Sequence, residues 1–193
     1  REPKGFINPA FAEYISSYTS GVVSSVSTIR ITLVNQAVDD AAVGEEAKGK
    51  LFSFTPAIKG KAIWIDKNTV EFRPEGRLVS GQRYEVNFNL SRLMDVPSSL
   101  SNFIYSFQVM PQPYEVTIDN VKPYVKTELT RQKIEGVLYT SDFADATAIE
   151  KALSARQDGK SLAVNWSHGG EGKQHAFIIE EVTRKEEASN VIV

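Results

Sequence analysis

Apolar and polar side chains alternate in short runs through the first 110 residues of the chain. A period of two places successive side chains on opposite faces of a β-strand, so each run predicts a strand with one buried face. The predicted strands are Thr28–Val34, Leu51–Phe54, Ala62–Ile65, Thr69–Arg73, Tyr84–Leu90 and Phe103–Val109. Because turn residues separate strands that recur about every ten residues, the pattern favours an antiparallel β-sandwich.

One of these strands also predicts which side chains reach solvent. Between Thr69 and Arg73 the alternation places Val70 and Phe72 in the core. It places Glu71 and Arg73 on the outer face, where charged side chains are usually solvated. We therefore expect the carboxylate of Glu71 to be exposed.

Three segments of this half show no regular period. Residues 1–27 are rich in serine, glycine and aromatic side chains, and they predict an irregular start with one or two short strands. Residues 36–50 are polar and predict a long loop, with a short helical turn at Asp39–Val43. Ser91–Asn102 predicts a further loop.

The pattern restarts after Met110–Pro113, a short segment whose two prolines predict a stiff linker. One helix is predicted, Asp145–Ala155, with Asp142 or Asp145 as its N-cap and an apolar stripe along one face. The predicted strands of this half are Tyr114–Ile118, Lys133–Thr140, Leu162–Trp166, Ala176–Glu180 and Glu187–Val193.

The chain is therefore predicted to be all-β, with two tandem antiparallel β-sandwich domains at residues 1–110 and 114–193. Its length of 193 residues suits two small domains of roughly 100 residues each. The second domain contains the one short helix. We expect this domain to be incomplete, because ~80 residues leave it one or two strands short of a sandwich.

The motif Leu78-x-x-Gly81-x-x-Tyr84 combines a turn glycine with a tyrosine at the start of a late strand. This spacing predicts a tyrosine corner, in which the ring packs in the core and the hydroxyl bonds to backbone upstream. The motif is therefore expected to stabilise the fold and to take no part in catalysis.

Composition excludes several classes of partner and chemistry. The formal net charge is -2, so no strong field attracts nucleic acid or an anionic membrane. Without cysteine, the chain has no disulfide, no cysteine-ligated zinc and no thiol catalysis. No apolar run approaches the ~20 residues that span a bilayer.

His168 and His175 are the two histidines of the chain, and they flank a glycine-rich segment, 169–172. Across a hairpin they could bind a metal with Glu171, but a metal site usually needs three or four protein ligands. We therefore expect two solvated turn histidines and predict no metal and no cofactor. Because no acid–base constellation occurs elsewhere, we predict no catalytic residues and no enzymatic activity.

Trp64 and Trp166 could serve as exposed platforms on which sugars stack. Each lies in an alternating strand, where a large aromatic side chain normally fills the core, so we expect both to be buried. Exposed rings would favour an alternative function, an Ig-like surface adhesin or a carbohydrate-binding module.

The succession F-x-P-x-x-x-G, then W, V-x-F-x-P and L-x-x-G-x-x-Y-x-V resembles the N-terminal Ig-like region of bacterial α2-macroglobulins. The matching residues are Phe54, Pro56, Gly60, Trp64, Val70, Phe72, Pro74, Leu78, Gly81, Tyr84 and Val86. The part after Pro113, with its short helix and its Asn165-Trp166 strand, resembles the start of the next macroglobulin-type domain.

This resemblance implies the non-catalytic N-terminal scaffold of a protease inhibitor, with both domains Ig-like. It implies export to the periplasm or the cell surface, with membrane contact only through an upstream lipid anchor. The implied partners are other domains of the same protein, and proteases trapped by the full-length protein. Such inhibitors use a bait segment and, in some members, a thioester, and no residue of this sequence can be assigned to either.

Overall fold

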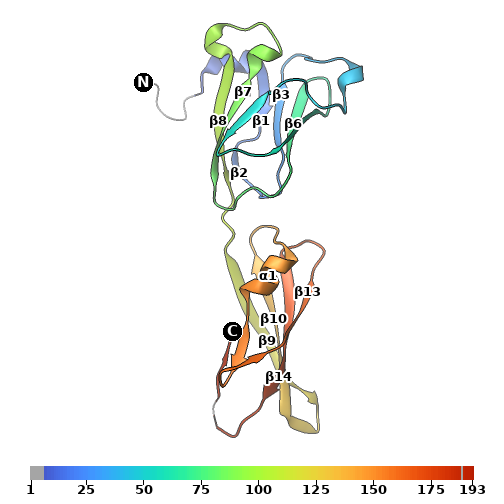
Figure 1. The fold of residues 1–193 in the computed structure, drawn as a ribbon, viewed down its shortest axis with the longest axis vertical. Helices are drawn as coiled ribbons and strands as arrows, with labels where there is room; N and C mark the ends of the chain where they lie inside the picture. Colours follow the sequence, from blue (N-terminus) through green and yellow to red (C-terminus); the bar gives the residue numbers. More distant parts are fainter. Residues whose placement is uncertain (1–6, 188) are drawn as a thin grey trace. The chain divides into compact units, whose positions relative to one another are not determined.

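The computed structural model describes residues 7–187 and 189–193. It divides the chain into two compact units, of which the first ends at Pro111 and the second spans Gln112–Val193 (Figure 1). Both units are built from packed antiparallel sheets, which confirms the predicted all-β sandwich class.

Two four-stranded sheets form the first unit. One has the strand order β1-β3-β6-β5, with bounds Ile15–Tyr18, Ile29–Leu33, Thr69–Pro74 and Gly60–Trp64. The other has the order β2-β8-β7-β4, with bounds Gly21–Val23, Asn102–Val109, Arg83–Asn89 and Phe52–Thr55. All strand pairs are antiparallel except β2 and β8, which run parallel. The way in which the strands are divided between the two sheets is that of an immunoglobulin-like sandwich.

Short 3-10 helices occupy several connections of the first unit. They are η1 (Pro9–Glu13), η2 (Asp40–Ala42), η3 (Leu90–Arg92) and η4 (Ser98–Leu100). The second of them confirms the helical turn expected in the polar loop at 36–50. Each of the six strands predicted for this half is present, with ends shifted by at most two residues.

Inward side chains of both sheets form the core of the first unit. Val70 and Phe72 are buried as predicted, and Phe88 and Phe107 of the facing sheet are at most 2% exposed. Tyr84 confirms the tyrosine corner: its ring is 4% exposed and its hydroxyl oxygen accepts a hydrogen bond from the Val79 amide at 3.3 Å. The hydroxyl thereby fixes the turn that leads into β7.

The second unit pairs a four-stranded sheet with a three-stranded one. The larger sheet has the order β13-β14-β10-β9, with bounds Val164–His168, Gln174–Thr183, Glu128–Thr140 and Tyr114–Val125. The smaller has the order β12-β11-β15, with bounds Lys160–Leu162, Ala155–Gln157 and Val191–Ile192. Helix α1 (Ala146–Ala152), labelled in Figure 1, follows β10 in the chain and precedes β11. Over the two described ranges, no helix has the length and apolar character required to cross a membrane.

Helix α1 is shorter than the sequence predicted. Asp145 is the N-cap, and its carboxylate accepts a hydrogen bond from the Ala148 amide at 3.2 Å. The helix ends at Ala152, and the backbone is already extended at Leu153. From there every second side chain is buried, as in a strand: Leu153 is 9% exposed and Ala155, the first residue of β11, is 1% exposed.

Strands β9 and β10 are longer than predicted, since they continue to Val125 and begin at Glu128. The side chains of their distal halves are largely exposed on both faces, so no alternation marks these residues as a strand. Nearer the core, Gly136 is required by packing: a Cβ atom there would lie 2.5 Å from the ring of Phe177, which is 1% exposed.

Candidate functional site

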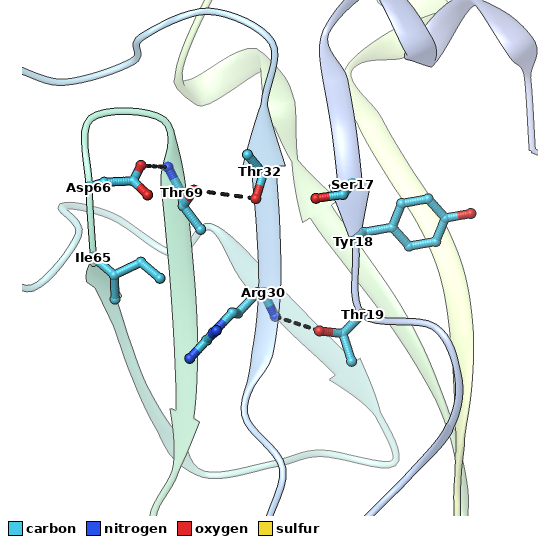
Figure 2. Close-up of a pocket in the computed structure, with 8 residues that line it drawn as sticks. All are labelled: Ser17, Tyr18, Thr19, Arg30, Thr32, Ile65, Asp66 and Thr69. Atoms are coloured by element: carbon cyan, nitrogen blue, oxygen red, sulfur yellow. Dashed lines mark hydrogen bonds between the residues drawn. The ribbon is translucent and has the colours of Figure 1, made fainter.

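A shallow polar hollow of about 430 Å³ lies on the outer face of the β1-β3-β6-β5 sheet (Figure 2). Its lining residues are Ser17, Tyr18, Thr19, Arg30, Thr32, Ile65, Asp66 and Thr69. Figure 2 shows the Tyr18 side chain pointing away from the hollow, and its ring packs on Phe103 at 4.9 Å between centroids. The hollow is therefore lined mainly by hydroxyl groups and by two charged side chains.

Most polar groups of the hollow bond to one another. The Thr19 hydroxyl oxygen accepts from the Arg30 amide at 2.9 Å, and the Thr69 and Thr32 hydroxyls are 3.3 Å apart (Figure 2). Asp66 accepts from the Asn68 and Thr69 amides at 2.9 and 2.6 Å. Burial raises the pKa of Asp66, but these hydrogen bonds outweigh it and hold the pKa below its ordinary value. The Asp66 carboxylate therefore closes the turn between β5 and β6.

Glu71 contradicts its predicted exposure, because the residue is only 3% exposed. It does point out of the sandwich, but neighbouring side chains cover it. Arg73 donates to Oε1 at 2.6 Å, Thr28 donates to Oε2 at 3.1 Å, and Arg30 also donates to Oε2. The two guanidinium groups remain more than half exposed while their carboxylate partner is enclosed.

The enclosed carboxylate of Glu71 stays ionised. Burial raises the pKa of Glu71. The hydrogen bonds from Arg73, Arg30 and Thr28 and the charge of Arg30 lower it by more, so the pKa lies below its ordinary value. Arg30 is the cross-strand partner of Glu71, which is why they meet. Sequence reasoning missed this cluster because the pairing of β3 with β6 is needed to bring the two positions together.

The two histidines are directly opposite each other on β13 and β14. Their Nδ1 atoms are 2.8 Å apart, and the Nε2 atom of His168 lies 3.1 Å from Oε1 of Glu150 on α1. His175 is 1% exposed, so the prediction of two solvated turn histidines is wrong for this residue. The hairpin brings the rings together, and the helix covers them.

His175 is held in its neutral form. Burial lowers its pKa, the charge of His168 lowers it further, and the Gly172 backbone opposes the shift only in part. The contacts therefore run from the neutral ring of His175 on β14, through His168 on β13, to the carboxylate of Glu150 on α1. Sequence reasoning missed Glu150, since its contact depends on where α1 lies.

Glu171 lies on the tip of the hairpin and is exposed, away from the buried ring of His175. Within residues 7–187 and 189–193, no three His, Cys, Asp or Glu side chains are grouped as a metal ion would require. The carboxylate near the histidines is that of Glu150. It contacts the Nε2 atom of His168, whereas the Nδ1 atom of His168 faces His175.

The tryptophans differ in their surroundings. Trp64 is 3% exposed, which confirms its predicted place in the core and removes it as a platform for sugars. Trp166 is partly buried: its ring packs on Phe177 at 5.5 Å and stacks on His168 at 5.9 Å with an interplanar angle of 6°. It joins the histidine pair to the second core.

Comparison with known proteins finds similarity to solved structures alone. No protein-family model matches the sequence, and no curated protein matches it significantly. An L,D-transpeptidase structure from Mycobacterium tuberculosis is similar at 17% identity and a TM-score of 0.36, covering 50% of this chain and 40% of that chain.

Two structures of L,D-transpeptidase 3 from the same organism are also similar. One, in complex with a faropenem-derived adduct, has 18% identity and a TM-score of 0.35, and covers 52% of this chain and 39% of that chain. The other has 15% identity and a TM-score of 0.34, with 63% and 44% covered. The chain therefore spans less than half the length of each of these proteins, and similarity of this size transfers no activity to it.

These findings overturn the macroglobulin assignment made from the sequence. The solved structures named above are L,D-transpeptidases, and no family model or curated protein links the sequence to macroglobulins. The predicted protease-inhibitor function is therefore wrong as well. The motif behind it has a structural explanation, because Trp64 fills the core and Tyr84 forms a corner that many Ig-like sandwiches use.

Proposed function

We propose that the chain is a non-catalytic pair of β-sandwich domains that holds and spaces other domains of the protein to which it belongs. The observation that supports this most directly is that its two enclosed titratable side chains, Glu71 and His175, bond to other side chains of the fold. The clusters around Glu71 and His175 both bond neighbouring elements to one another. Both oxygens of Glu71 accept from protein donors, and the Nδ1 atom of His175 and both ring nitrogens of His168 contact protein groups, so the main effect of these contacts is on the fold.

The chemistry of Glu71 supports a structural role. A general base works best when its pKa lies near the operating pH. Glu71 has its pKa held below the ordinary value, and both of its oxygens accept hydrogen bonds from donors. Such a carboxylate takes up a proton poorly and is well suited to joining β3 to β6.

The histidine pair supports the same role in the second unit. His175 is enclosed and neutral, while His168 bonds to it and to Glu150. The pair therefore fixes the register of the β13–β14 hairpin and holds α1 against it. This is a connection between elements rather than an open site that a substrate could enter.

We also propose that the chain works outside the cytoplasm, in the periplasm or at the cell surface. Tandem Ig-like sandwiches are common in cell-surface proteins, which supports this location. The proposed partners are neighbouring domains of the same protein. Fractionation of the native cells followed by detection with an antibody to this chain tests the location, and recovery in the cytoplasm alone would contradict it.

The structural role is tested by exchanging Glu71 and measuring both stability and binding. Glu71→Gln should lower the free energy of unfolding of the first unit by about 2 kcal/mol, since it leaves two guanidinium groups without their carboxylate. Glu85→Gln, on the outward face of the same unit's β7, is the matched control and should change it by less than about 0.5 kcal/mol. Urea unfolding measures both.

The same samples test for a binding site in the hollow of Figure 2. A panel of sugars, amino acids and short peptides is added while the backbone amide signals are followed by NMR. We expect no saturable shifts at the hollow. Saturable shifts at its lining residues would show a ligand site and overturn the purely structural role.

A further inference from the structure

Strand β9 leaves one edge of its sheet open. It pairs with β10 on one side, and within the described residues no strand pairs with its other side. The open edge of a strand presents unpaired backbone N–H and C=O groups, which another strand can use. Proteins often blunt such an edge with a charge, a proline or a bulge, and β9 contains Lys122, Pro123 and a bulge at Asp119, so a strand that adds here has to accommodate all three.

Apolar side chains also line the core-facing side of β9. Val116, Ile118 and Val121 are the register partners of Leu138, Gly136 and Ile134, whose side of the sheet faces the core. The three β9 side chains are nevertheless 38%, 50% and 57% exposed. An open edge beside an exposed apolar row is a docking surface for a further strand.

The sequence of β9 is complementary to itself in one antiparallel register. When Val116 is placed opposite Val121 of a second copy, Glu115 falls opposite the second copy's Lys122. The apolar pair then lies on the core-facing side and the charged pair on the outer side, because register shifts by one residue between Glu135 and Gly136 of β10. That shift leaves Asp119 of β9 without a partner on β10, which makes it a bulge. In the proposed register the bulges of the two copies lie beside each other at the centre of the pair.

The existing charges near Lys122 favour this partner. Lys122 and Lys133 are cross-strand neighbours that share one carboxylate, Glu135, at 2.6 and 3.0 Å. A second carboxylate beside Lys122 would balance the two cations. Glu115 of the second copy supplies it, and opposite charges placed directly across two strands attract.

We propose that two copies of the chain associate through β9, in an antiparallel pair that joins their β10 sheets into one. The pair has two-fold symmetry, so each Glu115–Lys122 contact occurs twice, as in other isologous interfaces. Pro123, which lacks an N–H group, lies opposite Tyr114 at the end of the paired segment. The proline therefore limits the length of the pair without interrupting its centre.

Charge reversal tests this register. In sedimentation velocity over a series of concentrations, the unaltered chain should form dimers. Glu115→Lys and Lys122→Glu should each weaken dimer formation by about tenfold, since each places like charges opposite each other twice. The double variant should restore it. Lys160→Glu on the exposed β12, with the same charge change in the same unit, is the control and should have no effect.

Disulfide formation gives an independent test, because the chain has no cysteine. Val116→Cys combined with Val121→Cys should give a covalent dimer under mild oxidation, whereas Val121→Cys alone should not. A chain that stays monomeric throughout the concentration series overturns the proposal. So does a dimer in which the charge reversals have no effect, or in which the single and double cysteine variants cross-link equally.

Discussion

Val86 and Phe88 of β7 are fully buried in the first unit, whereas Val116 and Val121 of β9 in the second are 38% and 57% exposed. Both pairs lie on the core-facing side of a four-stranded sheet. Two features differ. Strand β7 lies between β8 and β4 and faces a second sheet of four strands, whereas β9 is an edge strand in a unit whose second sheet has three strands, including the two-residue β15. Alternation therefore specifies which face a side chain lies on, and the neighbouring strands and the opposing layer decide whether that face is buried.

The largest expected effect contrasts these two rows directly. Phe88→Ala should lower the free energy of unfolding of the first unit by about 3–5 kcal/mol, because it leaves a cavity in a closed core. At protein concentrations low enough to keep the chain monomeric, Val121→Ala should change that of the second unit by less than about 0.5 kcal/mol. Each unit contains one tryptophan, so their indole N–H signals in NMR report urea unfolding separately. Equal losses at both sites under these conditions would show that β9 is already covered within a single copy of the chain.

A smaller effect is expected where each unit uses one side chain to fix a connection. Tyr84→Phe removes the hydroxyl that accepts from the Val79 amide, and it should cost the first unit about 1 kcal/mol. Asp145→Ala removes the cap of α1 and should cost the second unit about 1 kcal/mol. Thermal unfolding followed at both indole signals checks that each change stays within its own unit. A loss that spreads to both would contradict their independence.

The first unit should lose stability in acid through Glu71. Its pKa is lowered in the folded state, so the stabilisation is complete above the unfolded value of about 4.3 and is lost as the pH falls toward the lower folded value. Glu71→Gln should flatten this part of the curve of stability against pH. Urea unfolding between pH 2 and pH 6 is the measurement, in steps of roughly half a unit. An unchanged slope in the variant would mean that other carboxylates cause the loss.

The smallest expected effect concerns the second unit at milder pH. The folded pKa of His175 is lowered by burial and by His168, so the unfolded chain binds protons first as the pH falls. Stability should therefore decrease below about pH 6.5 and stop decreasing below the folded pKa. His175→Gln should remove this decrease. The first unit has no histidine and serves as the internal control in the same sample.

The strands of the first unit could be predicted because their alternation is set by burial on one face only. The buried position of Glu71 could not, since it depends on Arg30 and Arg73 folding over it from the outer face. The distal halves of β9 and β10 were missed for the opposite reason, because neither face is buried. The short helix was placed correctly at its start, where Asp145 caps it, and too long at its end.

The candidate clusters were harder to predict than the fold. The histidine pair was recognised as a pair across a hairpin, but its carboxylate neighbour proved to be Glu150 and not Glu171. A turn sequence shows that two residues can meet, and only the packing of α1 shows which third residue joins them. The expectation that the second domain is one or two strands short of a sandwich stays a prediction.

The parallel pairing of β2 with β8 has a mechanical consequence. Gly21, Val22 and Val23 are bonded alongside Phe107, Gln108 and Val109, next to the point where the chain leaves the first unit. Since the two strands run in the same direction, a force that pulls β2 by its N-terminal end and β8 by its C-terminal end slides them along each other. Their hydrogen bonds are then strained together instead of opening one by one, as they would in a hairpin pulled apart from its open end. A domain that links others under load would resist stretching at this pair.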